Sequence, residues 1–178
     1  MPYAPLADAR DTDRLSLRLW DEWDADGYRL LVCEREEARA EREGDRVDEG
    51  RLLSLDEARA EVTGARENAP RRGIHCLTLR LRGSDEFLGY CGLVVGRSTI
   101  DEPELAYELL RSAHGHGYAT EAAAAVVDAA RETGRDRLWS TVRAWNTPSF
   151  RVLDKLGFRR DHSTADELGE IVWSVLDL

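Results

Sequence analysis

Alternating apolar and polar positions predict a series of half-buried strands in the first part of the chain. Within residues 12–19, leucines fall on one face and polar side chains on the other. The alternation returns in residues 74–81, and apolar runs at residues 87–95 and 104–110 follow after short turns. Strands separated by turn residues such as those at 83–85 pair as hairpins. The middle of the chain is therefore predicted to be an antiparallel meander.

Capping and charged residues predict helices between these strands. Asp21 is placed to cap a short acidic helix. The mixed charges of residues 34–48 predict a solvated helix, and the alternative is a mobile lid beside a substrate cleft. Ser54 and Glu57 form a capping-box pattern at the start of a further helix. That helix should end before Pro70, because the residue before a proline avoids the α region.

The second half of the chain predicts helices and strands in alternation. Residues 117–133 are rich in alanine and predict one helix that packs closely on a sheet, with Gly134 at its end. The remaining predicted elements are a strand at 138–142, a helix over 146–156, a strand that begins at residue 158 and a last strand at 171–176.

The composition is that of an ordinary globular protein. The chain has 178 residues, 42% of them apolar and 34% charged, which suits one domain with a sizeable core. We expect residues 1–178 to form a single domain, with residues 1–11 as a loosely held arm. The chain has neither an apolar run of the roughly 20 residues that span a bilayer nor a secretory signal. We therefore expect a cytoplasmic protein without membrane contact.

The net charge and the spacing of the cysteines indicate which partners, substrates and metal sites to expect. The net charge of −10 argues against a nucleic-acid partner, which would require a basic face. The same charge is compatible with a cationic substrate such as an amine. Cys33, Cys76 and Cys91 have no metal-like spacing and are expected to be reduced core residues, so no metal site is predicted.

A glycine-rich loop at residues 114–121 lies between the predicted strand at 104–110 and the alanine-rich helix. The first turn of a helix offers unpaired backbone N–H groups and partial positive charge, and glycines let an anion approach the backbone. The loop therefore predicts a site for a pyrophosphate or similar anion, and the alternative is a tight strand-to-helix turn. Neither the P-loop pattern nor the dinucleotide-binding fingerprint is present.

Several segments together resemble a known family. They are Glu-Leu-Ala-Tyr at 104–107, Gly-His-Gly-Tyr-Ala-Thr-Glu-Ala at 115–122, and Asn-Thr-Pro-Ser-Phe-Arg-Val-Leu-Asp-Lys-Leu-Gly-Phe at 146–158. These segments resemble the GCN5-related N-acetyltransferases (GNAT), in the branch of RimJ/RimL-like ribosomal-protein N-terminal acetyltransferases. Residues 12–18 resemble that branch's first strand. The resemblance covers most of residues 12–177 and is weakest across residues 35–70.

The resemblance implies an α+β fold and a ligand. The expected fold is a mixed, mostly antiparallel sheet flanked by helices and splayed open between the strands at 104–110 and 137–143. Acetyl-coenzyme A is expected as co-substrate within the splay. The implied reaction moves the acetyl group to a primary amine, which could be a protein N-terminus or a small cationic amine. The variable helical region at 35–70 is expected to line the acceptor side.

The resemblance also implies which residues contact the cofactor. The family's phosphate loop has the form Gln/Arg-x-x-Gly-x-Gly/Ala, which maps here to His114, Gly117 and Ala119, with a departure at the first position. Asn146 would contact the pantetheine arm, although an Asn at a helix start is also a good cap. The expected cofactor-binding residues are Leu109, His114, Gly115, His116, Gly117, Tyr118, Ala119, Thr120 and Asn146.

Two residues are expected to take part in the chemistry. By resemblance Glu104 is the base that takes the amine proton, and its alternative is an acid at the end of a strand. Glu108 is a weaker candidate for the same role. Ser149 would protonate the leaving thiolate, and its alternative is a polar residue in a helix's first turn.

A second class of function stays open. The same site could bind acyl-coenzyme A for sensing or assembly without turnover. The presence of Asn146, Ser149 and an acid at position 104 favours catalysis over this alternative. The sequence does not determine the acceptor or the oligomeric state, and a homodimer is one alternative.

Overall fold

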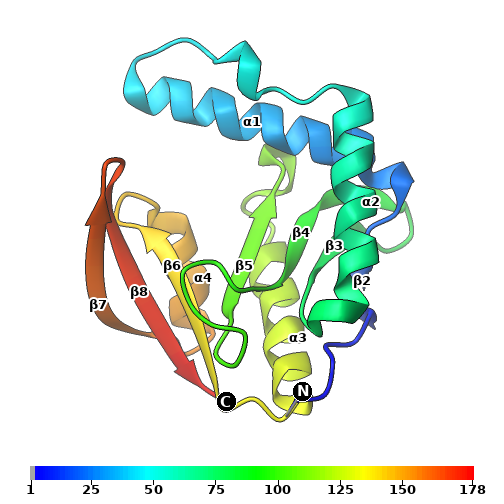
Figure 1. The fold of residues 1–178 in the computed structure, drawn as a ribbon, viewed down its shortest axis with the longest axis vertical. Coiled ribbons are helices and arrows are strands. Elements are labelled where there is room, and N and C mark those ends of the chain that lie inside the picture. Colours follow the sequence, from blue (N-terminus) through cyan, green and yellow to red (C-terminus); the bar gives the residue numbers. More distant parts are fainter. Residues whose placement is uncertain (1–2) are drawn as a thin grey trace.

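The computed structural model describes residues 3–178, which form a single sheet covered by helices (Figure 1). The strands are β1 (Ala9–Asp11), β2 (Leu15–Arg18), β3 (Cys76–Leu81), β4 (Glu86–Val94), β5 (Glu104–Leu109), β6 (Arg137–Arg143), β7 (Arg159–Asp166) and β8 (Gly169–Asp177). The helices are α1 (Ala25–Glu43), α2 (Leu55–Arg72), α3 (Tyr118–Glu132) and α4 (Thr147–Lys155). Short 3-10 turns occupy Glu22–Asp24, Glu49–Arg51 and Arg111–Ala113.

The 8-stranded sheet has the order β1-β2-β3-β4-β5-β6-β8-β7. The neighbouring strands pair in antiparallel fashion except β5 and β6, which run parallel. Within the described residues, the β5–β6 ladder consists of the single pair Glu104–Trp139. The two strands therefore touch at one end and diverge toward the other, below α1 in Figure 1. This splay confirms the expected α+β fold.

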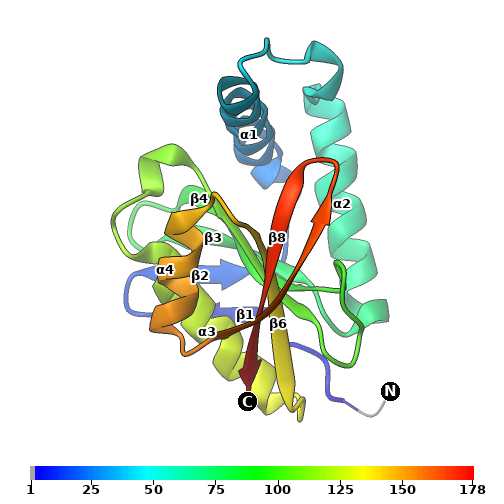
Figure 2. The ribbon, with the colours of Figure 1, turned by 90° about the vertical axis from the view of Figure 1, so that its left-hand side faces the viewer.

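Helices cover both faces of the sheet (Figure 2). The alanine-rich α3 packs against β2, β4 and β5, and its small side chains let the backbone approach the strands closely. Leu15, Leu17 and Leu79 are fully buried on this side, as the alternating pattern predicted. On β6, Leu138, Ser140 and Val142 are buried while the intervening residues are not, so the predicted faces of that strand are confirmed.

The opposite face carries α1 and α2 around a smaller aromatic core. Trp20 is buried there, with its ring centre 5.4 Å from that of Tyr28 and 5.9 Å from that of Tyr90. Gly27 on α1 lies directly against the ring of Phe87, and a Cβ at this position would overlap the ring. This close contact fixes α1 above β4, next to the open end of the splay.

The helical region differs from the prediction in two respects. Asp21 caps the 3-10 turn Glu22–Asp24, as predicted. The charged residues 34–48 were expected to form a helix of their own, but α1 runs continuously over Ala25–Glu43 and ends at Gly44 in a left-handed conformation. The charged stretch continues the helix because Val32, Glu36 and Ala40 bury one side of it. The expected end of α2 before Pro70 is also wrong. Proline's fixed φ suits a helix, and Pro70 lies in the last turn of α2, so the break that it makes in the hydrogen-bond ladder affects only the end of the helix.

The segment expected to be a loosely held arm packs on the domain from residue 3 onward. Leu6 is buried in the main core, and its amide donates to the carbonyl of Gly73 at 2.9 Å. The amide of Ala4 donates to the carbonyl of Thr133 at 3.0 Å, and β1 pairs with β2. Local sequence contains no signal for these contacts, because the partners lie far along the chain.

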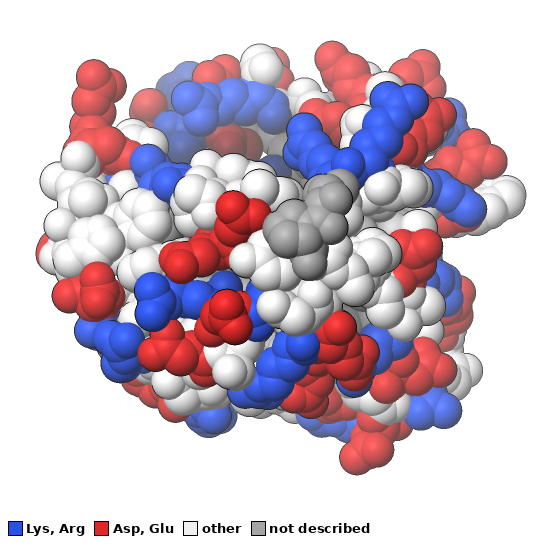
Figure 3. Space-filling model, turned by 60° about the horizontal axis from the view of Figure 1, so that its bottom comes forward, with Lys and Arg blue, Asp and Glu red and all other residues white. Residues whose placement is uncertain are grey.

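Charged side chains of both signs alternate over the surface. On the face shown in Figure 3, lysine or arginine and aspartate or glutamate are interspersed around uncharged areas. Many of them form ion pairs, for example Arg10 with Glu132 at 2.9 Å and Arg137 with Asp177 at 2.9 Å. Among residues 3–178, no helix has the length and apolar character that crossing a membrane requires.

Candidate active site

The open half of β5 turns its main chain toward the gap between β5 and β6. The amide of Leu110 donates to β4 at 2.9 Å, whereas the carbonyl of Leu105 accepts from the hydroxyl of Ser140 on β6 at 3.1 Å. Main-chain groups of successive strand residues point to opposite sides. Odd-numbered residues of β5 therefore face β6, and Tyr107 and Leu109 lie beyond the single paired position. Their main-chain groups line the splay and can bind an extended ligand.

The glycine loop follows directly at the open end of β5. Gly115 and Gly117 have φ angles of 79° and 82°, in the left-handed region that favours glycine. Gly117 is the N-cap of α3, and the amide of Glu121 already donates to its carbonyl. In the part of the chain that the structure describes, no side chain accepts a hydrogen bond from the amides of residues 115–120. Unpaired amides beside a helix dipole are the features that an anion site requires, and the anion site at this loop stays a prediction.

Side chains hold the loop in this conformation. The Nε2 atom of His114 lies 2.9 Å from the carbonyl oxygen of Leu109, which ties the loop back to β5. Arg14 donates to the carbonyl of His116 at 2.9 Å and to the carboxylate of Glu121 at 2.7 Å. Burial opposes ionisation of Glu121, but hydrogen bonds from Thr12 and Arg14 outweigh it and lower the pKa of this carboxyl group. The ionised Glu121 also stabilises the first turn of α3.

Across the splay, Asn146 and Ser149 begin α4. The side-chain oxygen of Asn146 accepts from the amide of Ser149 at 3.3 Å, so Asn146 caps the helix. The hydroxyl of Tyr107 on β5 donates to the carbonyl of Ser149 at 3.0 Å. Burial raises the pKa of Tyr107, which keeps its hydroxyl protonated as a donor. This contact places the first turn of α4 beside the open part of β5.

Glu104 lies at the closed end of the splay and is buried, with 5% of its surface exposed. One carboxylate oxygen accepts from the amides of Arg97 and Ser98, the second of these at 3.0 Å. The other oxygen accepts from the hydroxyl of Thr141 on β6 at 2.5 Å. Both oxygens are therefore engaged in joining the β4–β5 turn to β6. The arrangement favours a structural role for Glu104, the alternative that the sequence left open.

Glu108 lies on the same face of β5 as Glu104, about 13 Å further toward the open end at the usual rise of a strand. Its carboxylate accepts from the hydroxyl of Tyr90 at 3.1 Å and lies 3.5 Å from the guanidinium of Arg35 on α1. Burial raises the pKa of Glu108, although Arg35 and Tyr90 partly offset that effect. A partly exposed carboxylate with a raised pKa is suited to accept a proton.

Helix α1 covers the open end of the splay and contacts both of its sides. After β5, the amide of Arg111 donates to the carboxylate of Glu34 at 2.7 Å. Near the other end of α1, the guanidinium of Arg42 lies 3.9 Å from the ring centre of Trp145, two residues before the start of α4.

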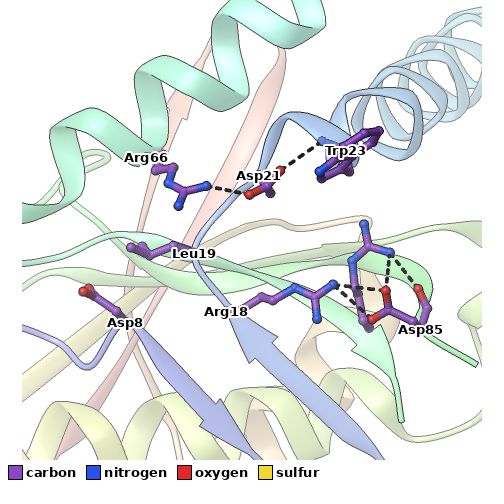
Figure 4. A pocket seen from close by; sticks show the side chains of 8 residues that line it. Asp8, Arg18, Leu19, Asp21, Trp23, Arg66 and Asp85 are labelled. Carbon is purple, nitrogen blue, oxygen red and sulfur yellow. Dashed lines mark hydrogen bonds and ion pairs between the residues drawn. The ribbon is translucent and has the colours of Figure 1, made fainter. Parts of the chain in front are cut away.

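A hollow of about 540 Å³ lies elsewhere, between α2 and the face of β2 and β3 (Figure 4). Its charged side chains pair with one another: Arg18 with Asp85 at 3.0 Å and Arg66 with Asp21 at 2.6 Å. Arg80 also pairs with Asp85, at 3.5 Å. These pairs connect β2, β3 and α2, and the hollow does not reach the splay residues.

Sequence reasoning missed several residues of this site. Tyr107 was part of a resembling segment without a role, although its position two residues from the apolar Leu105 would place both on one face. Arg14 and Tyr90 carry no local signal, because their contacts with the loop and with Glu108 depend on strand pairing. Arg35 was assigned to a separate solvated helix, and the continuity of α1 is what brings it to β5.

Comparisons with known proteins agree with this geometry. The model of the acetyltransferase (GNAT) domain family matches residues 14–159. An uncharacterized N-acetyltransferase p20 of Bacillus licheniformis is 29% identical over 82 residues, a stretch that spans 46% of this chain and 46% of that relative. The chain thus matches about half the length of this curated relative.

Solved structures show the same fold over nearly the whole chain. An acetyltransferase from Agrobacterium tumefaciens is 25% identical, with a TM-score of 0.74 over 97% of this chain and 95% of that one. Mycobacterium smegmatis RimJ in complex with CoA-disulfide is 20% identical, with a TM-score of 0.75 over 98% of this chain and 90% of that one. With a family match over more than half of its residues, this chain belongs to the GNAT family of acetyltransferases.

Proposed function

We propose that this protein transfers the acetyl group of acetyl-coenzyme A to a primary amine, either a peptide N-terminus or a small cationic amine. The observation that carries the proposal is the splay, which opens beside the unpaired amides of residues 115–120. Family membership and the structural likeness to RimJ, which was solved with CoA-disulfide, support the same reading. The net charge of −10 favours a cationic acceptor.

The residues of the splay have separate tasks in this proposal. The loop amides from Gly115 to Thr120 hold the pyrophosphate of acetyl-coenzyme A, and His114 keeps the loop tied to Leu109. The main-chain groups of Tyr107 and the N–H of Leu109 bind the extended pantetheine arm, and one of these N–H groups stabilises the oxyanion that forms on the thioester carbonyl.

Proton transfers complete the reaction. The amine nitrogen attacks the thioester carbon, a C–N bond forms and the C–S bond breaks. Glu108, which replaces Glu104 as the proposed base, takes the proton released by the amine, directly or through water. Ser149, in the first turn of α4, protonates the leaving thiolate. The raised pKa of Glu108 suits its role, because a base works best when its pKa approaches the working pH.

The test combines binding with turnover. Calorimetry measures the affinity for acetyl-coenzyme A, and a thiol-release assay measures transfer across a panel of amines and peptides. We expect binding together with acceptor-dependent release of coenzyme A. Binding without any acceptor-dependent thiol would favour the non-catalytic alternative, a sensor or assembly module. Absence of binding would refute the assignment of the loop.

A further inference from the structure

The two oxygens of the Glu108 carboxylate have different surroundings. Oε2 accepts from the hydroxyl of Tyr90 at 3.1 Å and faces the guanidinium of Arg35 at 3.5 Å. Among residues 3–178, no group donates a hydrogen bond to Oε1. Two groups from two different elements therefore hold one oxygen, and the other is available.

Tyr90 is held rigidly in its place. It lies directly opposite Glu108 in the β4–β5 ladder, where side chains of paired residues are neighbours. Its ring packs against Trp20, with the centres 5.9 Å apart. Burial raises the pKa of Tyr90 well above the ordinary value, and the negative charge of Glu108 raises it further. The hydroxyl therefore remains a hydrogen-bond donor at neutral pH.

The charged groups around Glu108 come from α1. Arg35 brings a positive charge to Oε2, and Glu34 on the same helix brings a negative charge. The carboxylate of Glu34 is committed to the amide of Arg111 at 2.7 Å. From β4, the titratable group that faces Glu108 is Tyr90. Arg35 is thus the cation that opposes the effect of burial on Glu108.

We propose that Tyr90 and Arg35 are positioning residues that fix Oε2 of Glu108 and leave Oε1 to take the proton from the acceptor amine. This inference rests on the proposed function. The two residues orient the carboxylate toward the acceptor side, and Arg35 favours its ionised form in a buried setting. Removing either partner should therefore make Glu108 harder to ionise, because an opposite charge or a hydrogen bond to a carboxylate stabilises the charged form.

The first experiment measures the ionisation of Glu108 without any acceptor. The full-length protein carries ¹³C-labelled glutamate side chains, and the resonance that disappears in Glu108→Gln is followed by NMR as pH changes. We expect Arg35→Gln to raise the pKa of Glu108 by about 1 unit and Tyr90→Phe to raise it by about half as much. Arg39→Gln is the matched control, because Arg39 pairs with Glu36 on its own helix at 2.9 Å.

The second experiment follows turnover as a function of pH. In Arg35→Gln the acidic limb of kcat/KM should move to higher pH by the same shift, and activity should recover at alkaline pH. Arg35→Lys keeps the charge and should return the limb toward that of the wild-type protein. The affinity for acetyl-coenzyme A should stay within about 2-fold in all these variants, because the pair does not touch the loop.

The outcomes separate this inference from the proposed function. A Glu108 pKa that is unchanged in both variants would overturn the positioning roles, even if the rate fell at every pH. The same holds if Arg39→Gln shifts the pKa as much as Arg35→Gln does. Absence of acceptor-dependent thiol in the wild-type protein would overturn the proposed function, and with it the proton transfer assigned to Oε1. The NMR titration would still decide whether Tyr90 and Arg35 control the ionisation of Glu108.

Discussion

Glu104 and Glu108 lie on the same face of β5, and replacing each should have opposite consequences. Glu104 accepts hydrogen bonds from two amides of the β4–β5 turn and from Thr141 on β6. Glu104→Ala removes the acceptor and leaves these donors unsatisfied at the closed end of the splay. We expect this variant to lose stability rather than chemistry.

The magnitude follows from the contacts of Glu104. A buried donor that loses its partner costs about 1–3 kcal/mol, and such costs are not additive within one cluster. Glu104→Ala should therefore cost about 3–5 kcal/mol. Glu104→Gln keeps the shape and one acceptor oxygen for the amides, and the hydroxyl of Thr141 can accept from the new amide group. We expect this variant to cost about 1–2 kcal/mol.

Thermal unfolding measures the effect directly. For a domain of this size, 1 kcal/mol corresponds to about 2–4 °C in Tm. Glu104→Gln should thus melt about 2–8 °C below the wild-type protein and keep kcat/KM within about 3-fold at a temperature where both are folded. Glu108→Gln should keep Tm within a few degrees and lose about 100-fold or more in kcat, the usual contribution of a general base.

The opposite pattern would refute this assignment. If Glu104→Gln keeps its Tm and loses about 100-fold in kcat with unchanged affinity for acetyl-coenzyme A, Glu104 is the base. Its three hydrogen bonds would then have to open during catalysis. If Glu108→Gln also retains full activity, water or another group takes the proton.

Four further variants, one of them a control, test the loop and α4. Gly117→Trp should abolish acetyl-coenzyme A binding by calorimetry, and Gly134→Trp, whose φ of 81° matches the 82° of Gly117 at the other end of α3, should strain the backbone equally but leave binding unchanged. Ser149→Ala should lower kcat by about 10-fold or more with an unchanged Kd for acetyl-coenzyme A, and equal turnover would remove its role as acid. Tyr107→Phe should cost about 1 kcal/mol, seen as a lower Tm, because the bond to the carbonyl of Ser149 is lost. An unchanged Tm in this last variant would mean that the bond does not hold α4 against β5.

The sequence predicted β2 to β8 well because they follow local patterns, whereas β1 was missed because it depends on its pairing with β2. Alternation gave the buried face of β6, and the glycines at 115 and 117 marked positions that the structure places in the left-handed region. The extent of α1 could not be predicted in the same way. The many charged residues of α1 hide, in the sequence pattern, which of its sides packs on α2 and β4. That packing also depends on residues distant in sequence, such as Phe87.

The different surroundings of Glu104 and Glu108 could not be predicted from the local sequence. Glu104 and Glu108 lie in the same strand and share a face, so the alternating pattern does not distinguish them. What distinguishes them is the partner strand: β6 touches β5 at Glu104 and has left it by Glu108. The carboxylate of Glu104 accepts hydrogen bonds that join the β4–β5 turn to β6. The carboxylate of Glu108 lies beyond the last β5–β6 pair and faces Arg35 on α1. Under the proposed function, the divergence of β5 and β6 serves both the thioester and the acid that takes the proton, so a variant that closed the splay should lose both cofactor binding and the base.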